Sequence, residues 1–309
     1  MPVVFAEPAV QQKNRFDPRP LYKLGIAASV VQREIIAGLL RYRSYFSGLI
    51  ATRIREIYLD LSFHKNAFTR LHKKKWKIKL AALTELYKLD IEADPLILSQ
   101  LAKHQNMYVR EYAGLSLIKF AKNDPLEFLH GLNEPISKWQ QLEIFLLFQQ
   151  RQDLRLSLPQ RLICMDKEPS VVMLCLKLAV HFNQQEAVPA MLDILGTPDL
   201  ELRAEAIASL GKLGSPDTGR YLSAIYPEQP AVIKLKILAA LGDLQSSEHL
   251  HFLEREFISS TDFDIKLYAA DALVKISPPS PAMIYRLTAG SEVNRSILNH
   301  SLDPLINAL

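Results

Sequence analysis

An internal repeat of about 31 residues limits the folds open to this chain more than any other feature of its sequence. Each repeat is marked by an apolar residue, usually followed by a basic one, at the start of a helical pattern. The seven markers are Ile78, Val109, Trp139, Val171, Leu202, Ile233 and Ile265. Successive markers are 30 to 32 residues apart. Such a period is typical of a stack of similar units and not of one closed core.

The apolar positions that follow each marker predict an amphipathic helix. In the clearest unit they are Leu202, Ala206, Leu210 and Leu213, which share one face of a helix. Five further units keep this frame, and the second position is small in five of the six, so we expect neighbouring helices to approach closely there. The unit at Trp139 breaks the frame, because Glu143 and Gln150 occupy apolar positions. We expect its helix to be rotated or bent.

Shorter apolar segments with helix-start residues lie between these helices. Asp94-Pro95, Asp124-Pro125 and Ser215-Pro216 each place a capping residue before a proline suited to the first helical turn. Thr197-Pro198-Asp199 turns the chain into the following helix in a similar way. Each unit is therefore predicted to be a pair of helices.

The segment 198–214, PDLELRAEAIASLGKLG, resembles the second helix of the short HEAT-like repeats of bacterial proteins. Its ending recurs as LGDL at 241–244. The resemblance covers roughly residues 64–280 and implies an all-α, right-handed superhelix of about seven helix pairs with atypical ends. It also implies that an Asp of the turn pairs with a basic residue of the second helix, as Asp199 with Arg203, or Asp262 or Asp264 with Lys266.

The two ends of the stack are expected to differ from the repeats, because a terminal unit must cover one apolar side. Residues 1–20 form a predicted disordered lead-in, and residues 281–309 a predicted helical cap that follows a proline-rich stretch. Residues 21–63 are predicted to form an amphipathic cap of one long helix or two helices end to end. Its apolar positions are Ile35, Leu39, Tyr42, Phe46, Leu49, Ile54, Ile57 and Leu61.

Charge is distributed unevenly along the chain. Residues 1–80 hold 16 Lys and Arg against 5 Asp and Glu, whereas residues 81–309 hold 21 against 28. The basic side chains concentrate in one short segment, whose candidate binding residues are Lys73, Lys74, Lys75, Trp76, Lys77 and Lys79. One interpretation is a solvated turn with Trp76 packed on the next unit. The other is a docking site for an anionic membrane surface or, with less support, nucleic acid.

Features of catalytic, metal-binding and membrane-spanning proteins find little support. None of the eight His is followed by Glu, as the HEAT-like iron hydroxylases require, and His249 and His251 have the wrong spacing for a pair of metal ligands on a helix. Cys164 and Cys175 are expected to be free thiols. No apolar run is long enough to cross a membrane. We therefore expect a cytoplasmic protein without cofactor or metal, at the inner face of a membrane if an anchor precedes this chain.

The resemblance does not name a function, because HEAT-like proteins include scaffolds, adaptors, nucleic-acid binders and a few enzymes, bilin lyases among them. We expect a non-enzymatic scaffold or adaptor that binds an extended peptide or a helix of a protein partner. The second helices would line its concave face, with candidate contacts Arg110, Glu111, Glu205, Lys236 and Tyr268. The alternative is a peripheral membrane or nucleic-acid-binding protein that uses the basic N-terminal third.

Overall fold

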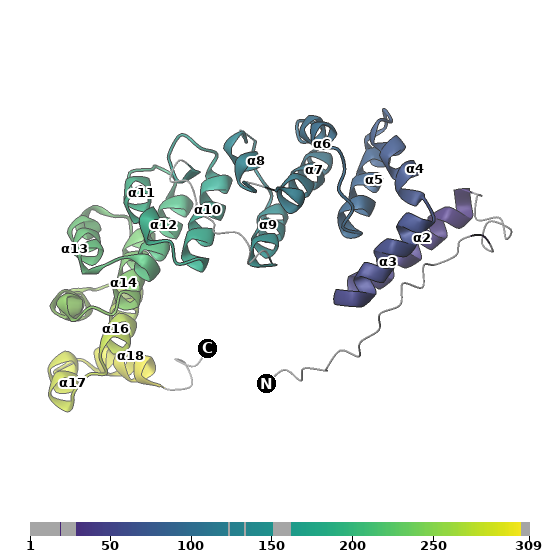
Figure 1. Ribbon diagram of the computed structural model, residues 1–309. Coiled ribbons are helices and arrows are strands. Elements are labelled where there is room, and N and C mark those ends of the chain that lie inside the picture. Colours follow the sequence, from purple (N-terminus) through teal and green to yellow (C-terminus); the bar gives the residue numbers. More distant parts are fainter. Residues whose placement is uncertain (1–18, 20–28, 123, 133, 151–161, 304–309) are drawn as a thin grey trace. The chain divides into compact units, whose positions relative to one another are not determined.

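The chain folds into paired α-helices throughout the part that a computed structural model describes, namely residues 19, 29–122, 124–132, 134–150 and 162–303. These residues contain seventeen α-helices, α2 to α18, and no strand (Figure 1). The predicted all-α, HEAT-like solenoid is thereby confirmed. The chain divides into two compact units, residues 1–125 and 126–309, which are described separately below.

The N-terminal unit contains two repeats preceded by two further helices. Its helices are α2 (Ser29–Tyr45), α3 (Gly48–Asp60), α4 (Phe63–Leu71), α5 (Trp76–Lys88), α6 (Pro95–Leu101) and α7 (Met107–Phe120). The pairs are α4 with α5 and α6 with α7, and the second helices α5 and α7 also pack against each other. Helix α2 lies against α5 and so covers the first repeat.

Of the two predicted forms of the N-terminal cap, one long helix or two helices, the structure has two helices, and their apolar stripe is not buried along its whole length. The chain turns between α2 and α3, where Gly48 has a φ of 61°, a conformation that glycine adopts without steric cost. Near this turn Tyr42, Phe46 and Leu49 are exposed, although their spacing predicted a buried face. Periodicity identified helical residues correctly here, but it could not show that the direction of the chain changes.

A hydrogen-bonded carboxylate ties three helices of this unit together. Glu85 of α5 is buried, and it accepts hydrogen bonds from the Tyr58 hydroxyl of α3 and from Arg70 of α4, the latter at 2.5 Å. Burial, followed by the nearby Glu85 charge, raises the pKa of Tyr58 above its ordinary value. The tyrosine therefore remains a donor, and each carboxylate oxygen has a partner.

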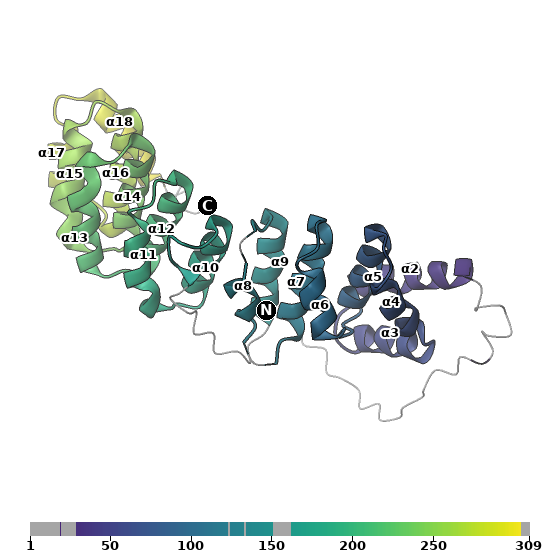
Figure 2. The same ribbon diagram turned by 90° about the horizontal axis from the view of Figure 1, so that it is seen from above.

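The C-terminal unit continues the repeat in two layers. Its helices are α8 (Glu127–His130), α9 (Lys138–Gln150), α10 (Pro169–His181), α11 (Val188–Ile194), α12 (Leu200–Leu213), α13 (Pro216–Ile225), α14 (Ala231–Asp243), α15 (Leu250–Ser259), α16 (Phe263–Ile276), α17 (Pro281–Thr288) and α18 (Glu292–Leu302). The second helices α9, α10, α12, α14, α16 and α18 pack in series. Helices α11, α13, α15 and α17 form the outer layer (Figure 2).

All seven sequence markers lie near the start of a second helix, in α5, α7, α9, α10, α12, α14 and α16. The predicted frame is buried in α12, where Leu202, Ala206, Leu210 and Leu213 all lie in the core. The close approach between second helices also involves two glycines one repeat apart. A Cβ on Gly211 would lie 2.8 Å from Cα of Ala240, and one on Gly242 would lie 2.9 Å from Cα of Ala272.

Most of the predicted helix starts are observed. Asp94 caps α6, Asp199 caps α12, and Ser215 forms a capping box with Thr218 at the start of α13. The Asp124-Pro125 pair behaves differently, because the helix that follows it, α8, begins only at Glu127 and has a single turn. The predicted lead-in lies outside the described residues except for Arg19, and so does the end of the predicted C-terminal cap, residues 304–309. Within that cap, α17 and α18 pack on α15 and α16 as a further helix pair.

The basic residue after the marker joins the two helices of its pair in the units of Arg203 and Lys266, but its partner differs from the expected Asp. Arg203 donates to the carbonyl of Thr197, while the Asp199 carboxylate caps α12 by accepting from two backbone amides. Lys266 likewise donates to the carbonyls of Phe257 and Ile258 at the end of α15. These cations satisfy backbone carbonyls at the end of the first helix, which has no intrahelical donors for them. The predicted structural role is correct, and the predicted carboxylate partner is wrong.

Candidate binding groove

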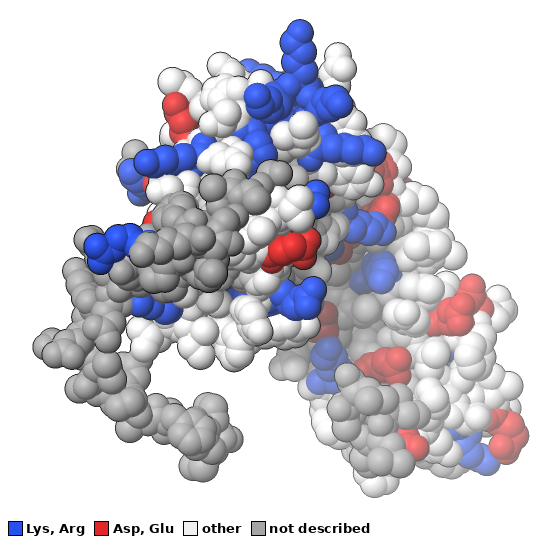
Figure 3. All heavy atoms as spheres, turned by 90° about the vertical axis from the view of Figure 1, so that its right-hand side faces the viewer, with Lys and Arg blue, Asp and Glu red and all other residues white. Residues whose placement is uncertain are grey.

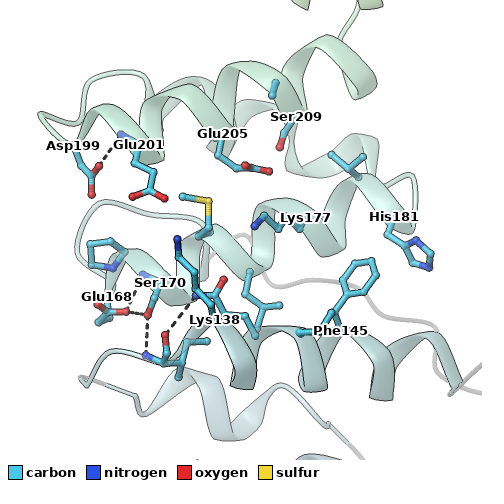
Figure 4. A pocket seen from close by; sticks show the side chains of 18 of the residues that line it. Lys138, Phe145, Glu168, Ser170, Lys177, His181, Asp199, Glu201, Glu205 and Ser209 are labelled. Atoms are coloured by element: carbon cyan, nitrogen blue, oxygen red, sulfur yellow. Dashed lines mark hydrogen bonds between the residues drawn. The ribbon is translucent and has the colours of Figure 1, made fainter. Parts of the chain in front are cut away.

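A groove of about 800 Å³ runs along three second helices of the C-terminal unit, α9, α10 and α12 (Figure 4). Nineteen residues line it, most of them on these three helices. The side chains that form it recur every three or four residues on each helix, so each helix presents one continuous stripe to the groove. Volumes of this size are typical of ligand-binding clefts.

Helix α9 is rotated relative to the other second helices and contributes apolar side chains to the floor of the groove. The residues that α9 buries are Gln140, Ile144, Leu147 and Phe148, which places its core face one position beyond the frame of the other repeats. The rotated helix anticipated from the broken frame at Trp139 is thus observed. Leu142 and Phe145 of α9 line the groove, and 56% of Leu142 is exposed.

Helix α10 completes the floor with Met173, Leu174 and Val180. At one end Phe145 of α9 meets His181 of α10 edge to face, with ring centroids 4.9 Å apart. Figure 4 shows the two rings facing each other at this end of the groove, where their contact joins α9 to α10. An apolar floor open to solvent favours binding of an apolar surface, because the hydrophobic effect scales with the apolar area that is removed from water.

The two ends of the groove carry opposite charge. The end nearest the N-termini of α10 and α12 is lined by Glu168, Asp199, Glu201 and Glu205, with Lys138 of α9 facing them. The opposite end is lined by His181 and Lys212, and Lys177 lies nearer the middle of the groove, beside Glu205 in Figure 4. Among the residues that the structure describes, no carboxylate forms an ion pair with Lys177 or Lys212. A ligand that lies along the groove therefore meets negative charge at one end and positive charge at the other.

Two of the acidic residues also hold the N-terminal end of the groove in place. Glu168 caps α10 by accepting from the Ser170 amide at 2.8 Å, and the Ser170 hydroxyl also donates to it. The same hydroxyl accepts from the Ile136 amide at 2.9 Å and so links α10 to the segment before α9. Asp199 caps α12. Glu201 and Glu205 have no such capping role and present their carboxylates to the groove.

A buried hydroxyl lies among the lining residues near the positive end. Ser209 of α12 is 2% exposed, and its Oγ has no hydrogen-bond partner. Its side chain points from α12 toward the groove (Figure 4). A buried polar group without a partner costs about 1–3 kcal/mol. The Ser209 hydroxyl is therefore a candidate hydrogen-bond partner for a ligand in this part of the groove.

The five residues expected on the concave face are divided between the two units. Glu205 lines the groove, Lys236 is exposed on α14, and Tyr268 is partly buried on α16. Arg110 and Glu111 belong to the N-terminal unit. Arg110 donates to the backbone carbonyls of His104 and Gln105, and Glu111 is only 5% exposed, which leaves little of it for a partner.

The basic segment of the N-terminal unit forms the turn between α4 and α5 and the first turn of α5. Lys73, Lys74, Lys75 and Lys77 are exposed, and Lys and Arg gather along the upper edge of this unit in Figure 3. Lys79 is less accessible and donates to the carbonyl of Leu71 at 2.9 Å, so it caps α4.

Trp76 begins α5 and is 36% exposed. The Lys77 ammonium lies 5.7 Å from the centroid of its ring. The side chain therefore lies within the basic segment, partly open to solvent.

Sequence reasoning identified Glu205 but missed most of the groove, including Leu142, Met173, Lys177, His181 and Ser209. The unit at Trp139 carried one usable indication, since a helix that breaks the common frame must place apolar residues elsewhere. Groups of three or more acidic, His or Cys residues able to hold a metal ion are absent from the described residues. The described helices also include none that is long and apolar enough to cross a membrane.

Comparisons with known proteins agree with this architecture. Residues 162–241, which include α10 and α12 of the groove, match the family model of HEAT repeats. Among solved structures, the chain is similar to the complex of CpcE and CpcF of phycocyanin lyase from Nostoc sp. PCC7120, at 15% sequence identity. That match covers 97% of this chain and 100% of the other, with a TM-score of 0.32, which is too low to support an argument about function. No curated protein has a sequence that matches this chain.

Proposed function

We propose that this HEAT-repeat protein is a scaffold or adaptor that binds a segment of a protein partner in the groove of α9, α10 and α12, without catalysis. The observation that carries this proposal is the open apolar floor of that groove, bordered by charges of both signs. Apolar floors with polar rims are typical of protein-binding surfaces. HEAT repeats build extended surfaces of this kind by stacking second helices side by side.

Placing a photo-crosslinking amino acid at Met173, on the groove floor, tests the proposal. The matched control has the same amino acid at Tyr221, an exposed residue of α13 outside the groove. In cells, the Met173 probe is expected to form a covalent adduct with a protein partner that the Tyr221 probe does not form. Adding Ala208→Trp, which fills the groove from α12, should abolish that adduct. Identical adducts from both positions, or an adduct unaffected by Ala208→Trp, would contradict the proposal.

The basic segment at the start of α5 favours a second candidate function, binding to an anionic surface. Four exposed lysines next to a partly exposed Trp76 would attract lipid headgroups, each basic residue contributing about 1 kcal/mol near an anionic membrane. Nucleic acid would be attracted by the same charges, with a steep dependence on salt.

Vesicle sedimentation with and without phosphatidylserine tests this second function. The variant carries Glu at Lys73, Lys74, Lys75 and Lys77, and the control carries Glu at two other exposed lysines of the unit, Lys88 and Lys103. Membrane binding predicts that the wild type and the control sediment with anionic vesicles and the variant does not. Equal sedimentation of all three proteins would refute it, and loss of binding to duplex DNA instead would identify nucleic acid.

A further inference from the structure

We propose that the occupant of the groove is an amphipathic helix of the partner, antiparallel to α10 and α12, with acidic residues in its first turn and basic residues in its last. This inference rests on the proposed function and specifies the chemistry of the partner. It follows from three observations: the order of the charges along the groove, the apolar floor between them, and the buried Ser209 hydroxyl without a partner.

The order of the charges follows from the repeat itself. Val171 of α10 and Leu202 of α12 are 31 residues apart and occupy equivalent positions. By the same offset Lys177 is level with Ala208, and His181 is level with Lys212. Lys212 therefore lies at the end of the groove where Figure 4 shows His181, while Lys177 lies about one turn nearer the middle, beside Glu205.

The opposite end keeps an excess of negative charge. Of its lining residues four are acidic, Glu168, Asp199, Glu201 and Glu205, against the single cation Lys138. Glu168 and Asp199 also cap α10 and α12. The groove is thus polarised along its length, and this polarity selects the direction in which a charged segment lies.

Length favours a helix over a strand as the occupant. Glu201 and Lys212 are eleven residues apart in α12, which corresponds to about 16 Å along the helix axis. A helix spans this distance in about three turns, so its first and last turns reach the two charged ends while its apolar stripe covers the floor. A strand would span it in about five residues and would place only alternate side chains on the floor.

Direction follows from the helix dipole. Acidic residues stabilise the first turn of a helix and basic residues the last, so a stable amphipathic helix already carries this order of charge. Such a helix meets complementary charge only when its N-terminus lies over Lys177 and Lys212. It is then antiparallel to α10 and α12, which is also the favourable alignment of neighbouring helix dipoles. The Ser209 hydroxyl lies at this end and can donate to an acidic side chain of the first turn.

A displayed library of helical peptides tests the inference. Its members share a fixed apolar stripe, and their charges are random in the first and last turns. The targets are the wild type, a charge-inverted variant (Lys177→Glu, Lys212→Glu, Glu201→Lys and Glu205→Lys), and Ala208→Trp. The wild type is expected to enrich peptides with an acidic first turn and a basic last turn. The inverted variant should enrich the reverse order, and Ala208→Trp should enrich neither.

Affinity measurements by fluorescence anisotropy then give the size of the effect. The enriched peptide should bind the inverted variant about tenfold or more weakly than the wild type, since exposed pairs become like-charge contacts. The difference should shrink as salt increases. Ser209→Ala should weaken this peptide several-fold while raising the melting temperature of the free protein, because the substitution removes a buried hydroxyl without a partner. Each variant is first checked for unchanged helical content by circular dichroism.

Several results would overturn the inference. The wild type could enrich no peptide, or enrich peptides without a preferred order of charge. The wild type and the charge-inverted variant could also enrich peptides with the same order of charge. A dimer of the free chain that Ala208→Trp dissociates would show that a second copy fills the groove. A bound small molecule that the wild type retains and Ala208→Trp loses in native mass spectrometry would identify a different kind of ligand. The crosslink from Met173 is read independently, so a partner captured there would uphold the proposed function even if charge order proved irrelevant.

Discussion

Gly211→Ala, which adds one methyl group, should destabilise the C-terminal unit. The added Cβ would lie 2.8 Å from Cα and 2.9 Å from Cβ of Ala240, closer than real Cβ atoms approach other heavy atoms. Ala240 presents backbone at this point and cannot rotate away, so α12 and α14 must separate. Overpacking of a core costs about 1–3 kcal/mol.

Helix propensity acts in the opposite direction, because Gly-to-Ala substitution in a helix interior stabilises by about 1 kcal/mol. Since the contact is with backbone, we take the upper part of the overpacking range and expect a net loss of about 1–2 kcal/mol. For a unit of this size that corresponds to a decrease of about 2–8 °C in melting temperature. Thermal unfolding followed by circular dichroism measures this shift.

The same substitution at Gly38 provides the matched control. Gly38 lies inside α2, and a Cβ there would meet no atom within 4 Å. Gly38→Ala should therefore stabilise the N-terminal unit by about 1 kcal/mol, because only the higher helix propensity of alanine acts there. If Gly211→Ala proved as stable as the wild type or more stable, the close packing of α12 on α14 would not have the energetic role assigned to it here.

Three further predictions concern buried titratable groups. Glu85→Ala should cost about 3–5 kcal/mol in chemical denaturation, because it leaves the buried Tyr58 hydroxyl and the partly buried Arg70 without their acceptor; a cost below 1 kcal/mol would refute this role. Burial lowers the pKa of His249 below its ordinary 6.5, so the unfolded chain binds the proton more readily, and stability should fall as the pH decreases below about 6.5. His249→Gln should lose that part of the pH dependence, and an unchanged pH profile would contradict the assignment. Burial raises the pKa of the Cys175 thiol to about 12, so Cys175 should resist alkylation in the native protein at pH 8 and react after denaturation; rapid native labelling would show that α10 opens.

The sequence predicted the second helices well because their information is local and periodic. Leu202, Ala206, Leu210 and Leu213 lie in the core as their spacing requires, and Asp199 caps its helix as its position before α12 requires. The small residues at the close contacts were also visible, although the shortest approaches involve Gly211 and Gly242, one turn beyond the position singled out by the frame. Local signals of this kind need no knowledge of the neighbouring repeat.

Features that depend on tertiary contacts or on the path of the chain were beyond the sequence. Arg203 binds a backbone carbonyl. Every residue has such a carbonyl, so the sequence does not show which one the arginine will bind. The turn at Gly48 interrupts an apolar stripe whose period continues across it. The groove needs outward-facing residues of three helices to converge, and only the broken frame of α9 hinted at it. Ser209 reads as an ordinary small residue of α12 until its lack of a partner is seen.

Hydrogen exchange of the free and partner-bound protein tests the central claim most directly. The partner is the protein crosslinked through Met173, or a helical peptide enriched by the wild type. Binding in the groove predicts slower exchange in α9, α10 and α12, with little change in the turn between α4 and α5 or in α17. Protection concentrated at Lys73–Lys77, with the three groove helices unchanged, would contradict the claim and place the binding site on the basic segment.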